Sequence, residues 1–199
     1  GMKLAEKYAM PVKIRACDTL GLGLPFSEVA LPRSVPKLIH SLVYEGGVPS
    51  EWLEWHGHND FHKVHANSLA AWLYGASGVN GTLLGCGERT GNSPLEGLIV
   101  EYIGLRGEGH GINTALLTEI GKYMSSLGIE IPASYPLLGA EFTKTRAGVH
   151  ADGSLKNERI YAAFDPQKLL NRPFEVSVTD KSGLAGIAYW VRLYLKRHG

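Results

Sequence analysis

The chain has 199 residues, of which 44% are hydrophobic and 20% charged, and its formal net charge is +1. This is the composition of an ordinary globular protein of one or two domains. The small net charge argues against nucleic acid as a partner. No apolar run is long enough for a membrane span. No signal peptide is visible, and the two cysteines, Cys17 and Cys86, are too few for a disulfide framework, so we expect a cytoplasmic protein.

The first two thirds of the chain predict strands and helices in alternation. Apolar runs bounded by glycine or proline predict strands over 12–16, 52–56 and 78–84. Helical spacing of apolar residues predicts helices over 36–44, 61–74, 94–105 and 114–127. Alternating strands and helices are typical of βαβ units with a parallel sheet.

The length of each unit predicts part of a (β/α)₈ barrel. The units repeat about every 35 residues, close to the spacing in a complete barrel of about 250 residues. Residues 1–128 therefore supply three or four units, which is half of a catalytic barrel. Residues 129–199 contain a proline-rich linker, short helices, a strand over 174–178 and a helix over 183–196, and we expect a small helical subdomain there.

Two polar motifs follow neighbouring strands and predict a metal site. His56 and His58 are two residues apart, so on a strand their side chains point to the same face. About thirty residues later, a glycine-rich loop ends at Asn92, which is a candidate third ligand. Two imidazoles and an amide oxygen suit a divalent metal such as Zn, Mn or Co, and Mg is also compatible.

Together these motifs resemble the 2-isopropylmalate synthase/homocitrate synthase family over nearly the whole chain, and they are closest to the homocitrate and Re-type citrate synthases. The resemblance rests on one long spaced pattern of matching residues: His56, His58, Asn59, Asp60, Ala66, Asn67, Gly75, Ala76, Gly85, Gly87, Glu88, Arg89, Gly91, Asn92, Leu95 and Glu96. The stretch from 148 to 157 is similar to a motif in the subdomain of that family.

The resemblance implies an acyltransferase that condenses acetyl-CoA with a 2-oxo acid and then hydrolyses the thioester. It implies that His56, His58 and Asn92 hold the divalent metal. It also implies that three residues bind the substrate: Thr19, Glu88 and Arg89. His150, assisted by Tyr161, resembles the general base of the family, which the partner subunit of a dimer contributes.

The same resemblance implies that the first half of the barrel is absent. The chain begins near the fifth barrel strand and contains no Arg-Asp pair, which in the family supplies a metal-binding aspartate and a catalytic arginine. We therefore expect a homodimer or pairing with an N-terminal half-barrel. Two alternatives stay open: a metal-dependent aldolase or lyase of the related barrel family, and a catalytically incomplete fragment or assembly subunit.

Overall fold

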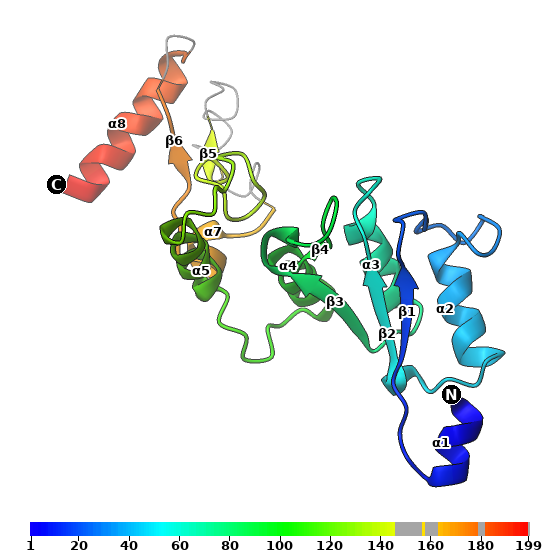
Figure 1. Cartoon of the computed structure of the whole chain (residues 1–199). Helices are drawn as coiled ribbons and strands as arrows, with labels where there is room; N and C mark the ends of the chain where they lie inside the picture. The colour runs from blue at the N-terminus through cyan, green and yellow to red at the C-terminus, as the bar shows by residue number, and fades with distance from the viewer. Residues whose placement is uncertain (146–156, 158–162, 179–181, 199) are drawn as a thin grey trace. The chain divides into compact units, whose positions relative to one another are not determined.

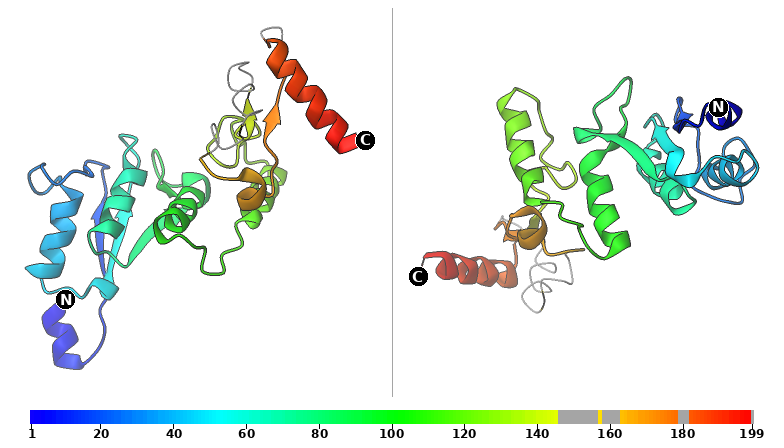
Figure 2. Two further views of the ribbon diagram at one scale, coloured as in Figure 1. Left: turned by 180° about the vertical axis from the view of Figure 1, so that it is seen from behind. Right: turned by 90° about the horizontal axis from the view of Figure 1, so that it is seen from below.

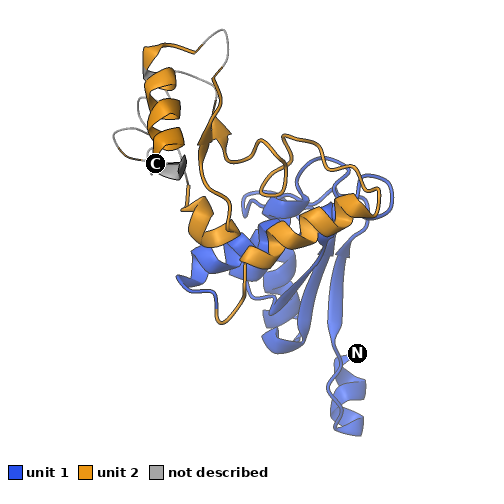
Figure 3. Ribbon diagram, turned by 90° about the vertical axis from the view of Figure 1, so that its left-hand side faces the viewer, with its two compact units in different colours: residues 1–109 blue, residues 110–199 orange. Residues whose placement is uncertain are grey.

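The computed structural model describes residues 1–145, 157, 163–178 and 182–198. The chain forms two compact units, residues 1–109 and 110–199 (Figure 3). The predicted division after residue 128 stays a prediction. None of the helices in the described ranges is long and apolar enough to cross a membrane.

Unit 1 contains four strands and their connecting helices (Figure 1). In chain order its elements are α1 (Met2–Tyr8), β1 (Ile14–Asp18), α2 (Val35–Tyr44), the short 3₁₀ helix η1 (Ser50–Trp52), β2 (Leu53–Gly57), α3 (Val64–Leu73), β3 (Gly78–Thr82), the 3₁₀ helix η2 (Leu83–Gly85), β4 (Ser93–Pro94) and α4 (Leu95–Arg106).

The four strands form one parallel sheet in the order β1-β2-β3-β4. The first three strands lie side by side when seen from the front and from behind (Figure 1, Figure 2). The register aligns Cys17 with His56, and His56 with Asn80. An α/β fold with parallel strands is thus confirmed, and all carboxyl ends of the strands meet at one edge of the sheet.

The apolar core of unit 1 lies on one face of this sheet. Leu53 and Trp55 alternate with polar residues along β2 and are almost fully buried. They pack with Ala16 of β1 against apolar residues of α2 and α3. Helix α2 is started by Ser34, whose hydroxyl accepts a hydrogen bond from the backbone N–H of Lys37. The side chains at alternate positions therefore point to the opposite, polar face.

Among the element boundaries that differ from the prediction, two have identifiable reasons. Strand β1 begins at Ile14 instead of residue 12, because its pairing with β2 starts there, opposite Leu53. Helix α3 begins at Val64 instead of residue 61, because His62 has a positive φ of 57° and its backbone N–H bonds to the carbonyl of Asn59, which makes a turn. Helix α1 was not predicted.

Unit 2 consists of helices around a small strand pair. Its described elements are α5 (Ala115–Ser126), β5 (Lys144–Thr145), α7 (Pro166–Leu170), β6 (Glu175–Val176) and α8 (Leu184–His198). Strands β5 and β6 are parallel. Val176 and Tyr189 form a small buried cluster between β6 and α8. The predicted helices at 114–127 and 183–196 are confirmed, whereas most of the short helices expected between 139 and 164 lie outside the described residues.

Candidate metal and substrate site

His56 and His58 lie together at the carboxyl end of β2. Their ring centroids are 5.1 Å apart and the rings are nearly perpendicular, at 89°. The backbone N–H of His58 donates to the carbonyl of Asp18, at 3.2 Å, so the end of β1 holds the second histidine in place. Burial, followed by the nearby imidazole of His58 and the cation of Arg15, lowers the pKa of His56. The neutral form of this imidazole is therefore favoured, which is the form that binds a metal.

Asn92 is held against the same strand end with a defined amide orientation. Its Nδ2 donates to the carbonyl of Gly57 at 3.0 Å, and its backbone forms an antiparallel bridge with His58. Because Nδ2 is used in this way, Oδ1 faces the other side of the amide. A Cβ on Gly87 would lie only 2.1 Å from this oxygen, so position 87 must be glycine to leave room for it.

The loop that carries Asn92 is closed by its own backbone. The N–H of Asn92 donates to the carbonyl of Gly85 at 2.8 Å, and the N–H of Gly91 donates to that of Glu88 at 3.0 Å. Gly85 and Gly91 both have positive φ, where a side chain would be strained. The backbone conformation of this loop therefore explains why glycine occurs at positions 85 and 91.

Arg89 ties three strand-end loops together. Its guanidinium donates two hydrogen bonds to the carboxylate of Asp60, at 2.8 and 3.1 Å, and one to the carbonyl of Thr19 at 2.5 Å. The hydrogen bond from Arg89 lowers the pKa of Asp60, and the same contact raises the pKa of Arg89. This two-pronged contact fixes the loops after β1, β2 and η2 relative to one another.

Asp18, at the end of β1, has a different task from the histidines. Its two carboxylate oxygens accept the backbone N–H groups of Leu22 and Gly23, at 2.8 and 2.9 Å. Asn67 of α3 completes this arrangement by donating to the carbonyl of Gly23 at 3.0 Å. Both oxygens of Asp18 are thus used to shape the first loop.

The residues present fit a divalent metal with three neutral donors. Within the described ranges, no three His, Cys, Asp or Glu side chains gather closely enough to hold a metal ion, so the set depends on the amide of Asn92. The Nδ1 atom of His58 is buried and has no hydrogen-bond partner among the described residues. A buried polar atom in that state is costly, and a bound cation nearby would compensate it.

Six of the eight predicted site residues lie around this edge of the sheet. They are His56, His58 and Asn92 on one side, and Thr19, Glu88 and Arg89 in the flanking loops. Their metal and substrate roles stay predictions. His150 and Tyr161 lie outside the described residues.

Sequence reasoning did not assign structural roles to Asp60 and Gly87. Both residues belong to the motifs that match the family, but their structural roles are visible only in the folded chain. Asp60 faces Arg89 from another loop, and Gly87 lies against the amide of Asn92.

Several relatives of this chain are named as synthases. The citrate (Re)-synthase of Syntrophus aciditrophicus is 52% identical over 199 residues, which cover 100% of this chain and 32% of the relative. The citrate (Re)-synthase of Clostridium kluyveri is 50% identical over 196 residues, which cover 98% of this chain and 43% of the relative. More distant relatives include proteins named 2-isopropylmalate synthase and homocitrate synthase, so the predicted resemblance is confirmed. The chain spans less than half the length of these relatives.

A solved structure supports the fold. The HMG-CoA lyase of Acenitobacter baumannii, in complex with coenzyme A and 3-methylmalate, superimposes with a TM-score of 0.50 at 23% identity, covering 65% of this chain and 41% of the lyase chain. At this identity the likeness concerns the fold alone. The sequence profile of the HMGL-like family matches residues 2–124. Because that match covers more than half of the chain, the protein belongs to the HMGL-like family.

Proposed function

We propose that this chain is the metal-binding part of an acyl-CoA:2-oxo acid condensing enzyme. Two relatives at 50% identity or above are named synthases of citrate, and others are named for homocitrate and 2-isopropylmalate. The proposed reaction joins the methyl carbon of acetyl-CoA to the carbonyl carbon of a 2-oxo acid, and water then hydrolyses the thioester and releases CoA. The observation that carries the proposal is the placement of His56 and His58 beside Asn92.

The three donors would share one divalent cation, Zn, Mn, Mg or Co. When bound, the cation supplies Lewis-acid polarisation of the substrate carbonyl. The imidazole of His56 is suited to this task because its lowered pKa favours the neutral, metal-binding form. The hydrogen bond from Asn92 Nδ2 to Gly57 keeps the amide oxygen available as the third donor.

The loops around the metal ligands would orient the 2-oxo acid. Thr19 is exposed at the end of β1, where its hydroxyl would donate to the substrate carboxylate. Glu88 and Arg89 would line the same space. Two of the guanidinium nitrogens of Arg89 already bond to Asp60 and Thr19, so we expect Arg89 to act mainly by holding these loops and to reach the substrate only with its remaining N–H groups.

A general base must remove a proton from the acetyl methyl group. We propose His150 for this step, with Tyr161 as its partner, on the strength of the family motif around them. A histidine suits the step because its ordinary pKa lies near neutrality.

We further propose that the sheet is part of a (β/α)₈ barrel, roughly strands 5–8, with 1–128 as its half and 129–199 as the following subdomain. The parallel order β1-β2-β3-β4 supports this arrangement. An N-terminal half-barrel or a second copy of the chain would complete the site. The mass of the native polypeptide in its cell of origin, detected with an antibody to this chain, tests the arrangement. A mass well above 21.6 kDa supports a continuous barrel, and a mass of 21.6 kDa means that a separate N-terminal half-barrel or a second copy of the chain must complete the site.

The activity is tested on the protein expressed from its complete gene. CoA release from acetyl-CoA should depend on a 2-oxo acid and on added divalent metal, and His58→Ala should abolish it together with tight metal binding. His40→Ala, on the surface of α2, serves as the matched control and should keep both properties. Undiminished CoA release by the His58 variant would contradict the metal role, and release of pyruvate by retro-aldol cleavage without CoA chemistry would point to an aldolase.

A further inference from the structure

The carboxylate of Glu96 is buried in unit 1 and has no part in the site described above. Glu96 is the second residue of α4, and only 1% of it is exposed. Burying a carboxylate costs free energy unless hydrogen bonds compensate it. Its Oε2 accepts the backbone N–H of Leu84, at 3.1 Å, in the short helix η2. A buried charge thus holds one particular backbone group, which indicates a specific task for it.

The backbone group that Glu96 holds lies in an unfavourable conformation. Leu84 has φ 58° and ψ 14°, in the left-handed region that residues other than glycine rarely adopt. The following residue, Gly85, also has a positive φ, of 65°. A leucine remains in this conformation only where its surroundings hold it there. The hydrogen bond to Glu96 is such a contact, and it is made by the N–H of Leu84 itself.

The turn at Leu84 and Gly85 carries the backbone acceptor of Asn92. The carbonyl of Gly85 accepts the N–H of Asn92 at 2.8 Å, and the direction of that carbonyl depends on the backbone angles of the turn. The side chain of Asn92 in turn donates to the carbonyl of Gly57 at the end of β2. A continuous series of contacts therefore leads from the buried carboxylate through the turn to the amide of Asn92.

We propose that Glu96 is a positioning residue for the metal site: it holds the turn at Leu84 so that the amide of Asn92 lies beside the two histidines before the metal binds. The inference rests on the proposed function, since that function makes Asn92 a metal ligand. Glu96 acts through the loop alone and is assigned no contact with the metal or the substrate. A ligand that is already ordered loses less conformational freedom on binding, so its support raises the affinity for the metal.

The experiment measures Mn²⁺ binding by calorimetry with the protein expressed from its complete gene. Glu96→Leu removes the acceptor at similar side-chain volume, and the affinity for Mn²⁺ should fall by about 10- to 100-fold. Glu96→Gln keeps an oxygen that can accept the N–H of Leu84, so its affinity should stay within about threefold of that of the parent. This rescue by the conservative variant separates loss of the contact from loss of the charge.

A glycine at position 84 tests the same contact from the other side. Glycine adopts the left-handed region without strain, so a turn with glycine there should depend less on Glu96. Leu84→Gly in the Glu96→Leu background should therefore regain most of the lost affinity for Mn²⁺. The double variant should also fold if the single variant Glu96→Leu is too unstable to measure.

Leu98→Ala is the matched control for general destabilisation. Leu98 is buried in the same helix, with 2% exposed, and its side chain lies against Gly81 of β3. Its truncation should lower the urea midpoint and leave the affinity for Mn²⁺ unchanged. Amide hydrogen exchange gives a second readout, in which the N–H of Leu84 should exchange faster in Glu96→Leu and not in Glu96→Gln.

The outcomes separate this inference from the proposed function. Glu96→Leu that binds Mn²⁺ as tightly as the parent, or that loses no more affinity than Leu98→Ala, would overturn the role of Glu96 and leave the metal site standing. Unchanged exchange at Leu84 would also overturn it, as would a double variant that neither folds nor regains affinity. A parent protein that binds no divalent metal would contradict the proposed function and this inference together.

Discussion

Replacing Gly87 by alanine tests the geometry of the candidate ligand Asn92. The new Cβ would lie 2.1 Å from Oδ1 of Asn92 and 3.0 Å from its Cγ, whereas ordinary contacts begin near 3.4 Å. The amide must therefore move by more than about 1 Å, which breaks the bond from Nδ2 to the carbonyl of Gly57. Because Asn92 is only 8% exposed, water cannot replace that bond easily.

The expected cost follows from the loss of a buried hydrogen bond. Leaving such groups without partners costs about 1–3 kcal/mol, so the free energy of unfolding should fall by that amount, and the affinity for Mn²⁺ or Zn²⁺ should fall with it. Urea denaturation followed by tryptophan fluorescence measures the first quantity, and calorimetric metal titration measures the second.

Gly104→Ala is the matched control for this experiment. Gly104 lies in α4, and no atom lies within 4 Å of the position that a Cβ would take there, so alanine should stabilise the helix by about 0.5–1 kcal/mol. If Gly87→Ala unfolds at the same urea concentration as the parent and binds metal equally well, the argument that Gly87 makes room for the Asn92 amide is wrong.

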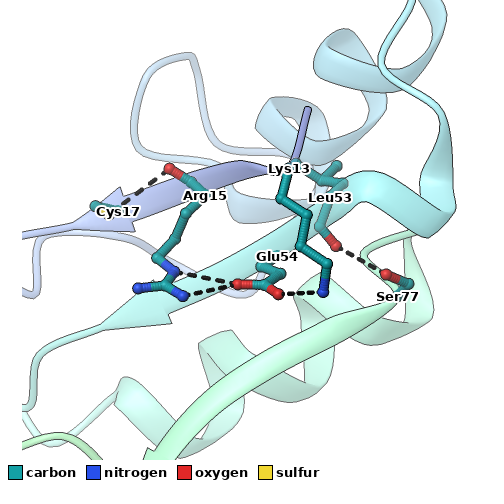
Figure 4. A network of polar contacts seen from close by, with 6 residues as sticks. All are labelled: Lys13, Arg15, Cys17, Leu53, Glu54 and Ser77. Carbon is teal, nitrogen blue, oxygen red and sulfur yellow. Dashed lines mark hydrogen bonds and ion pairs between the residues drawn. The ribbon is translucent and has the colours of Figure 1, made fainter. Parts of the chain in front are cut away.

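Three further predictions concern stability. Hydrogen bonds from Lys13 and Arg15 hold the pKa of Glu54 at about 2 instead of 4.5 (Figure 4), so its ion pairs should contribute fully above pH 4.5 and be lost as the pH falls toward 2. Melting temperatures between pH 2 and 5 should therefore fall less steeply with acid in Glu54→Gln than in the parent, and equal slopes would contradict this role of Glu54. Leu53→Ala should lower the free energy of unfolding by about 2–5 kcal/mol, because Leu53 is fully buried. Leu73→Ala, at an exposed position, should change the free energy of unfolding little. Equal urea midpoints for the two variants would contradict the assigned core. Arg89→Lys should lower the melting temperature and weaken metal binding, because one ammonium group cannot make the contacts to both Asp60 and Thr19. Lys122→Gln is the control. It removes an exposed ion pair on α5 and should change neither the melting temperature nor metal binding.

The sequence was sufficient to locate the main elements and the histidine pair. The spacing of two residues predicted that His56 and His58 lie close together, and they do, although β2 ends at Gly57 and His58 follows the strand. Glycine spacing likewise located the loop ending at Asn92. These signals are local, and each can be recognised without knowing which strands are neighbours.

The contacts that depend on register could not be predicted in the same way. The cluster of Lys13, Arg15 and Glu54 forms only because β1 is aligned with β2 so that Arg15 lies opposite Glu54. The contact between Arg89 and Asp60 joins residues 29 apart, in loops whose paths are set by turns. Helix α1 has only 7 residues, which is too short for a helical apolar period to be recognised in the sequence.

The closed loop that ends at Asn92 restricts its own length as well as the identity of its glycines. A Cβ on Gly91 would collide with the carbonyl of Gly85, and the bond from Asn92 N–H to that carbonyl fixes how many residues fit between them. Residues 86–90 are nevertheless exposed, so most of their side chains face solvent. Substitutions at Cys86 or Thr90 should therefore be tolerated, whereas inserting or deleting one residue in this loop would displace Asn92 from the histidines even if every side chain of the site were kept.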